Sequence, residues 1–171
     1  MIPDIVTMAK AAGNGQPLGF VALRRSVAEE FQRLEGSFFS SAGGCPVSCV
    51  TGIAVLRLLR TDNLQERARV VGLHLHNRLL ALAERCPGAV GCIHGKGLYQ
   101  GVELSLGGSP DAPAPSAMTR AICRRLLERG VVCHGTGDYS NVLKVKPPLC
   151  LSIADADHFV DSLEHVLTTG W

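Results

Sequence analysis

A single lysine stands where an apolar run meets a glycine-rich turn near the start of the chain. Lys10 follows the apolar segment 5–9 and precedes a Gly-Asn-Gly turn at 13–15, a pattern typical of a short buried strand that runs into a loop. An amine at a strand end is partly removed from water, which favours its neutral, nucleophilic form. The alternative is an ordinary lysine whose stem packs on the protein while its ammonium stays in water. Position alone therefore makes Lys10 a candidate nucleophile and leaves both interpretations open.

Cysteines and histidines are the other residues whose chemistry needs an explanation. The sequence has seven cysteines and no CxxC pair, and nothing nearby completes a ligand set around Cys45 and Cys49. The odd count and the apolar surroundings of most cysteines favour buried free thiols in a reducing compartment, so we expect no metal site and a cytoplasmic location. His74 and His76 are two apart on an expected helix, so they point to different faces and should lie in water.

The composition is that of a globular protein without a nucleic-acid or membrane partner. Of the 171 residues, 46% are hydrophobic and 19% are charged, which excludes a disordered chain. The net charge is only +2 and no block of lysine and arginine is present. No apolar run approaches the roughly 18 residues of a membrane-spanning helix, and the first residues do not have the form of a signal peptide.

Apolar spacing predicts the elements that must position Lys10. Two short buried strands are expected at 5–9 and 17–23, and a buried helix at 47–59 that begins after Pro46. A longer helix at 62–86 should carry one apolar stripe, formed by Leu64, Ala68, Val71, Leu75, Leu79 and Leu82.

The second half of the chain reads as an α+β unit. Strands are expected at 89–95 and 97–106, then a helix from Ala117 to Glu128, then strands at 131–135 and 142–146. A last amphipathic helix should begin at Ser152 as its cap. The first part, about 60 residues long, is too small to bury much surface by itself. It should therefore pack on a partner or belong to a longer protein.

Four segments of the chain need one explanation: Lys10 with its "GNG" turn, "SSAGGCPVSC", "IHGKGLYQGVEL" and "NVLKVKPPLCLS". Together and in this order they resemble the second half of the class III (ornithine and 4-aminobutyrate type) aminotransferases. The resemblance implies an α/β fold: the end of a fold-type I large domain at 1–61, a connecting helix at 62–86 and a small α+β C-terminal domain at 87–171. It also implies the cofactor pyridoxal 5'-phosphate, a small amine or amino acid as substrate, and a homodimer.

The resemblance assigns roles to two residues of the first part. Lys10 becomes the Schiff-base lysine and catalytic base, for which a compact amine of tunable charge is suited and an arginine is not. Ser41 stands where the family has a threonine that binds the cofactor phosphate of the neighbouring subunit, and its hydroxyl with nearby N–H groups suits the same task. The alternative is a serine that only caps the following turn.

Lys144 bears on the type of reaction. Transaminases of the family have an arginine here that binds a substrate carboxylate through two parallel hydrogen bonds, a contact that a lysine cannot reproduce. The lysine is closer to the phospho-lyases of the family, which eliminate phosphate from phosphoethanolamine or phosphohydroxylysine. As alternate strand residues, Lys144 and Lys146 would share a face and offer two charges to a phosphate, or simply line a surface. Transamination and elimination both stay open, with Lys144 favouring elimination.

The chain also departs from the family. Ala11, Ala42, Cys45 and His94 replace its usual residues, and the family's upstream aspartate for the pyridine nitrogen has no counterpart. We therefore expect an N-terminally truncated member. The alternative from another class is a non-catalytic remnant that folds or associates without cofactor turnover.

Overall fold

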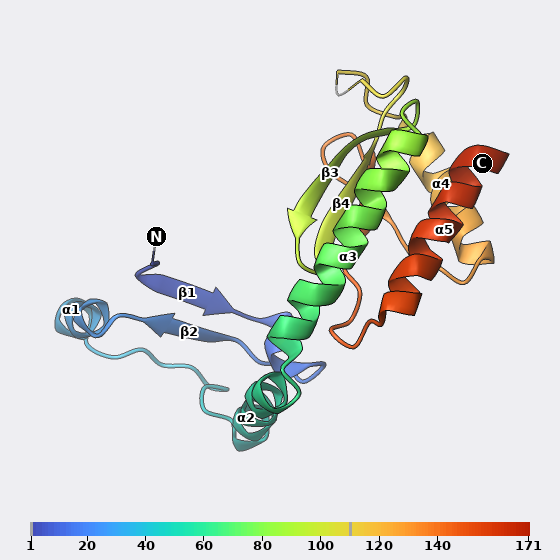
Figure 1. Cartoon of the computed structure of the whole chain (residues 1–171). Helices are drawn as coiled ribbons and strands as arrows, with labels where there is room; N and C mark the ends of the chain where they lie inside the picture. Colours follow the sequence, from blue (N-terminus) through green and yellow to red (C-terminus); the bar gives the residue numbers. More distant parts are fainter. Residues whose placement is uncertain (1, 110) are drawn as a thin grey trace. The chain divides into compact units, whose positions relative to one another are not determined.

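The structure, a computed structural model, describes residues 2–109 and 111–171, and the chain forms two compact units, 1–63 and 64–171 (Figure 1). The first unit contains strands β1 (Ile5–Met8) and β2 (Phe20–Leu23), the 3-10 helix η1 (Lys10–Gly13) and helices α1 (Arg25–Glu35) and α2 (Pro46–Thr61). The two strands form an antiparallel ribbon, with Ile5 opposite Leu23 and Met8 opposite Phe20.

The apolar segments of the first unit form the expected elements but are not buried. Every residue of β1 is exposed except the half-buried Met8, and Gly52 is the one buried residue among the sixteen of α2. The predicted burial is therefore wrong for this chain, because a two-stranded ribbon and two helices offer too little surface to cover these side chains. The large exposed apolar residues of α2 are Val47, Val50, Ile53, Leu56 and Leu58.

The second unit is a four-stranded antiparallel sheet with helices on one face. Its strands are β3 (Val90–Lys96), β4 (Tyr99–Leu104), β5 (Gly135–Thr136) and β6 (Val142–Val145), in the order β3-β4-β6-β5. The helices are α3 (Leu64–Arg85), α4 (Ser116–Glu128) and α5 (Ile153–Thr169), and Figure 1 shows α3 lying along β3 and β4 with α5 beside it. The predicted order of strands and helices is confirmed, although the strand expected at 131–135 shrinks to the short β5.

The core of the second unit lies between this sheet and its helices. The predicted stripe on α3 is confirmed, since Leu75, Leu79 and Leu82 are at most 1% exposed. From the sheet, alternate residues of β4 and β6 point toward the helices, and these are Val102, Leu104, Leu143 and Val145. Each fully buried leucine contributes about 1.5–3 kcal/mol through the removal of its apolar surface from water.

Buried polar contacts hold α3 against the β3–β4 hairpin. The Gln100 side chain is 4% exposed and donates from Nε2 to the carbonyl oxygens of Gly72 (2.8 Å) and Gly97 (2.7 Å). His76 Nδ1 lies 3.2 Å from Gln100 Oε1, while His74 contacts α5. Both histidines are half-buried, so the prediction that they lie in water is wrong. Their carbonyl and carboxylate partners come from distant segments that helical spacing does not reveal.

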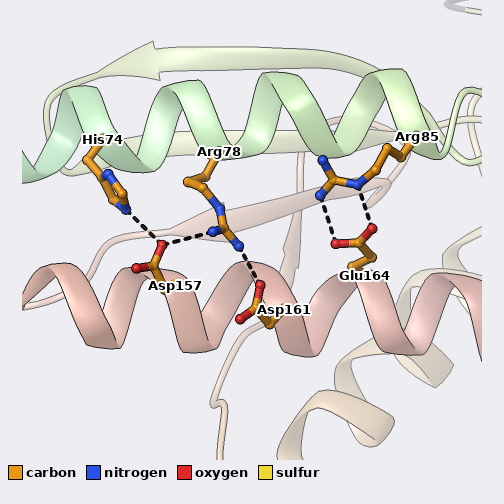
Figure 2. Close-up of polar contacts among 6 residues, drawn as sticks. All are labelled: His74, Arg78, Arg85, Asp157, Asp161 and Glu164. Carbon is orange, nitrogen blue, oxygen red and sulfur yellow. Dashed lines mark hydrogen bonds and ion pairs between the residues drawn. The ribbon is translucent and has the colours of Figure 1, made fainter.

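Ion pairs connect α3 with the C-terminal helix α5 (Figure 2). His74 Nε2 lies 2.7 Å from Asp157 Oδ1, and Arg78 pairs with both Asp157 and Asp161. The paired residues are spaced four apart on each helix, so the basic side chains of α3 face the acidic side chains of α5. Further along, the Arg85 guanidinium forms a two-pronged contact with the Glu164 carboxylate, at 2.5 and 2.7 Å.

Local features complete this unit. The predicted cap of α5 is confirmed, because Ser152 Oγ accepts from the Asp155 N–H at 3.1 Å and Asp155 in turn accepts from the Ser152 N–H at 3.0 Å. No helix within residues 2–109 and 111–171 has the length and apolar character needed to span a membrane.

The expectation of mostly buried cysteines is wrong: all seven are free, one is buried, and three are exposed, namely Cys49, Cys92 and Cys150.

Candidate functional site

Lys10 lies at the point where β1 ends and η1 begins. Ala9 is still extended, whereas Lys10 has a φ of 53°, in the left-handed region that residues other than glycine rarely adopt. Such a conformation costs on the order of 1–3 kcal/mol and tends to occur at functional sites. The Lys10 side chain is exposed in this chain, so the partial desolvation expected of it is not observed here.

The turn that follows Lys10 is fixed against the first turn of α2. Asn14 and Gly15 both have positive φ angles and reverse the chain after η1. Gln16 Nε2 then donates to Ser48 Oγ at 3.2 Å, and Ser48 Oγ donates to the Pro17 carbonyl at 3.0 Å. The end of the lysine loop and the first turn of α2, far apart in sequence, are thereby joined through Ser48.

Sequence reasoning did not identify Gln16 and Ser48 as part of this site. A glutamine after the Gly-Asn-Gly turn and a serine in the first turn of a helix are each common. The polar Ser48, two residues after Pro46 within an otherwise apolar run, was the available signal.

Ser41 lies in an exposed turn immediately before α2. The turn spans 41–44 and includes Gly44 with a φ of 73°. The next residue, Cys45, occupies the N-cap of α2, where hydrogen bonding from the Ser48 backbone lowers the pKa of its thiol. The N–H groups in the first turn of α2 favour negative charge at this point, as helix N-termini generally do.

Lys144 lies in the second unit, at the middle of the sheet. It pairs with Gly101 of β4, and its backbone N–H donates to the His134 carbonyl at 3.0 Å. Because Leu143 and Val145 point toward the helices, the half-buried Lys144 belongs to the opposite sheet face, which no helix covers within the described part of this unit. We call this the open face of the sheet.

A cavity of about 440 Å³ within the second unit lies on the helix-covered side of the sheet, because Leu75 of α3 and Ala156 and Phe159 of α5 line it. Its lining also includes Lys144, Lys146 and Asp155. Asp155 is already engaged by Ser152, whose hydrogen bonds lower the pKa of its carboxyl group.

The three predicted site residues make no polar side-chain contacts. Throughout residues 2–109 and 111–171, the Lys10 amine, the Ser41 hydroxyl and the Lys144 amine form no hydrogen bond or ion pair. The first two belong to the unit 1–63 and Lys144 to the unit 64–171. In the same described residues, no cluster of three or more His, Cys, Asp or Glu side chains is arranged to bind a metal ion.

Comparison with known proteins supplies the family context. A model of the family "Aminotransferase class-III" matches residues 1–167. The chain is 38% identical over 168 residues to alanine–glyoxylate aminotransferase 2 homolog 2, mitochondrial, of Arabidopsis thaliana, covering 98% of this chain and 34% of that protein. It is 33% identical over 167 residues to ethanolamine-phosphate phospho-lyase homolog 1 of Caenorhabditis elegans, covering 98% of this chain and 35% of the relative.

Solved structures show the same fold. A phospholyase from Arthrobacter in complex with phosphoethanolamine matches with a TM-score of 0.92 and 36% identity, over 100% of this chain and 40% of that one. A Bacillus anthracis aminotransferase matches with a TM-score of 0.87 and 29% identity, over 98% and 39%. The chain thus spans about a third of the length of the curated relatives it matches.

Proposed function

Because the chain belongs to the class-III aminotransferase family, we propose that it is the C-terminal part of a pyridoxal-phosphate-dependent enzyme acting on small amines or amino acids. The observation that carries this proposal is the junction through Ser48, which holds the end of the Lys10 loop against the first turn of α2. These two segments belong to the two motifs that together are most specific to the family. We propose that 1–61 is the end of the cofactor-binding domain, 62–86 the connecting helix and 87–171 the small C-terminal domain.

The residues present fit the cofactor. The Lys10 amine is exposed and has no polar partner among the described residues, so nothing competes with its covalent attachment to an aldehyde. The Ser41 hydroxyl lies in a glycine turn before a helix N-terminus that stabilises negative charge, as the lowered pKa of the Cys45 thiol indicates. An amine and an anion-binding turn are the groups that pyridoxal phosphate requires from this part of a protein.

Pyridoxal phosphate, when bound, supplies an aldehyde for attachment and an electron sink for the bond broken at the substrate. Lys10 would hold the cofactor and would move a proton at the substrate's α-carbon, for which its amine has to be neutral. Removal from water favours the neutral form of an amine, whereas the Lys10 side chain is exposed in this chain. We therefore infer that other parts of the longer protein desolvate Lys10.

Ser41 is proposed to bind the cofactor phosphate of a neighbouring subunit, together with backbone N–H groups of its turn. This role requires a homodimer. The large apolar side chains exposed along α2 support it, because a helix with such a surface is normally covered in the complete assembly.

The substrate is proposed to be a phosphorylated amine, with Lys144 as a binding residue for its phosphate. The lysine at position 144, where a two-pronged arginine contact is absent, supports this choice, as does the phosphoethanolamine named for the Arthrobacter structure. Transamination is the second candidate, since the Arabidopsis relative is named an aminotransferase. A non-catalytic remnant remains the alternative for the chain alone. A cytoplasmic location also stays a prediction, because that relative is named a mitochondrial protein.

Labelling of the lysine tests the assignment. The longer protein, read from the coding sequence upstream, would be incubated with pyridoxal phosphate, reduced with borohydride and digested for mass spectrometry. We expect the pyridoxyl group on Lys10 and its loss in a Lys10→Ala variant. Labelling confined to Lys144 or Lys146 would contradict the proposal.

A further inference from the structure

A bulge in β3 turns one cysteine to the open face of the sheet. Val90 pairs with Leu104 on the helix-covered side, and regular alternation would place Cys92 opposite Val102 on that same side. The register shifts at this point, so Cys92 pairs instead with Glu103. Cys92 is consequently exposed, on the same face as His94 two residues later.

Three side chains on this face form a continuous polar chain. Cys92 Sγ lies 4.0 Å from His94 Nδ1 and 3.7 Å from the Ile93 carbonyl oxygen, and His94 Nε2 lies 2.6 Å from Glu103 Oε2. The other carboxylate oxygen of Glu103 accepts from Asn141 Nδ2 at 3.5 Å. Asn141 is only 2% exposed and also donates to the Leu104 carbonyl at 2.9 Å. A buried amide thus helps to hold the carboxylate that orients the imidazole.

This order of groups is the one that activates a thiol. When Glu103 accepts the Nε2–H of His94, the Nδ1 atom is left as a proton acceptor that faces Cys92. As the thiol reacts, Nδ1 can accept its proton, and the Glu103 carboxylate stabilises the imidazolium that forms.

We propose that Cys92 is a modification site that undergoes thiol–disulfide exchange with small soluble disulfides such as glutathione disulfide. The Cys92 thiolate attacks one sulfur of the reagent and forms a mixed disulfide as the reagent's own S–S bond breaks. The other half leaves as a thiolate and takes the proton held by His94. The reagent supplies the disulfide, so no further oxidant is required.

The other cysteines provide the comparison within the same molecule. Burial raises the pKa of the thiols of Cys86, Cys123 and Cys133, which keeps them protonated at neutral pH. Cys150 is exposed, and its thiol makes no hydrogen bond within the part of the chain that the structure describes. Cys150 is therefore an internal reference for an accessible thiol that no imidazole activates.

The experiment measures exchange at each cysteine separately. The chain would be incubated with glutathione disulfide at pH 7, quenched with acid at intervals and digested for mass spectrometry. Because the His94 imidazole can take the thiol proton during the exchange, we expect Cys92 to react at least about threefold faster than Cys150.

Variants identify why Cys92 reacts faster than Cys150. His94→Gln should bring the Cys92 rate down to that of Cys150, while His165→Gln, which changes an exposed histidine on α5, should leave it unchanged. In guanidinium the rates of Cys92 and Cys150 should become equal, because the faster reaction of Cys92 requires the folded pairing of β3 with β4. Equal rates for Cys92 and Cys150 in the native protein would overturn the proposal, and this comparison holds even if a variant fails to fold. An unchanged rate in folded His94→Gln, or a faster reaction of Cys92 that persists in denaturant, would overturn it as well.

Discussion

Gly72 of α3 and Gly97 of the β3–β4 hairpin meet backbone to backbone. A Cβ atom built on Gly72 would lie 2.3 Å from the carbonyl carbon of Gly97, far inside van der Waals contact. Because the obstacle is backbone, Gly72→Ala must push the helix and hairpin apart. We expect the variant to lose about 3 kcal/mol or more of unfolding free energy, at or above the upper end for overpacked cores. Urea unfolding followed by circular dichroism would measure the loss.

Gly88 offers a matched control for this substitution. A Cβ atom there would meet no atom within 4 Å, and the residue does not have a positive φ. Gly88→Ala should therefore change stability by less than about 0.5 kcal/mol. Similar losses in the two variants would show that helix and hairpin can separate at little cost.

The contact between Arg85 and Glu164 should make stability depend on pH. The Arg85 guanidinium holds the pKa of Glu164 below its usual value of 4.5. A carboxyl whose folded pKa is lowered stabilises the native state above the unfolded pKa, and that contribution is lost as the pH falls through the folded pKa. Glu164→Gln should therefore be less stable than the native protein at pH 7, with the gap closing below about pH 4. A gap independent of pH would mean that charge is not its source.

Alkylation rates should distinguish two thiols whose environments shift their pKa values in opposite directions. Burial, with the neighbouring Cys123 thiol, raises the pKa of Cys133 to about 11, whereas the N-terminus of α2 lowers that of Cys45. With iodoacetamide at pH 7.5, Cys45 should be modified while Cys133 remains intact. Peptide mapping would measure both rates, and unfolding in guanidinium should bring them together. Modification of Cys133 first in the folded chain would contradict these environments.

The accuracy of the sequence predictions followed the range of the interactions involved. The apolar repeat of α3 and the cap at Ser152 depend on residues close in sequence, so both were predicted correctly. Burial of α2 depends on which other residues pack on the helix, and an apolar run in its sequence does not identify those residues. The junction of Gln16 with Ser48, and the approach of His94 to Glu103, depend on distant contacts and on strand register. A bulge of one residue decides that register, and no periodicity in the sequence predicts it.

Dimerisation of the longer protein is a direct consequence of the role proposed for Ser41. If its hydroxyl binds the cofactor of a neighbouring subunit, Ser41→Ala should weaken retention of pyridoxal phosphate without dissociating the dimer. The loss of one hydrogen bond to a charged phosphate corresponds to about 1.5–3 kcal/mol, or roughly tenfold to a hundredfold in cofactor affinity. Cofactor absorbance after dialysis, with light scattering for the mass, would test both parts. A stable monomer that retains cofactor would exclude the shared site.

Reaction type depends most on Lys144. A transaminase must hold the carboxylate of a keto acid, for which a guanidinium makes two parallel hydrogen bonds and an ammonium only one directed contact. The missing charged hydrogen bond corresponds to about 1.5–3 kcal/mol, or one to two powers of ten in binding. A substrate phosphate has no such need for a planar partner, and the compact ammonium groups of Lys144 and Lys146 suit it. We therefore expect the longer protein to release phosphate from phosphoethanolamine-like amines faster than it transfers an amino group to 2-oxoglutarate or pyruvate.

Lys144→Arg should shift the ratio of the two rates toward transamination by about tenfold or more. Efficient transamination by the unaltered enzyme, with no phosphate released from any phosphorylated amine, would exclude elimination as its reaction.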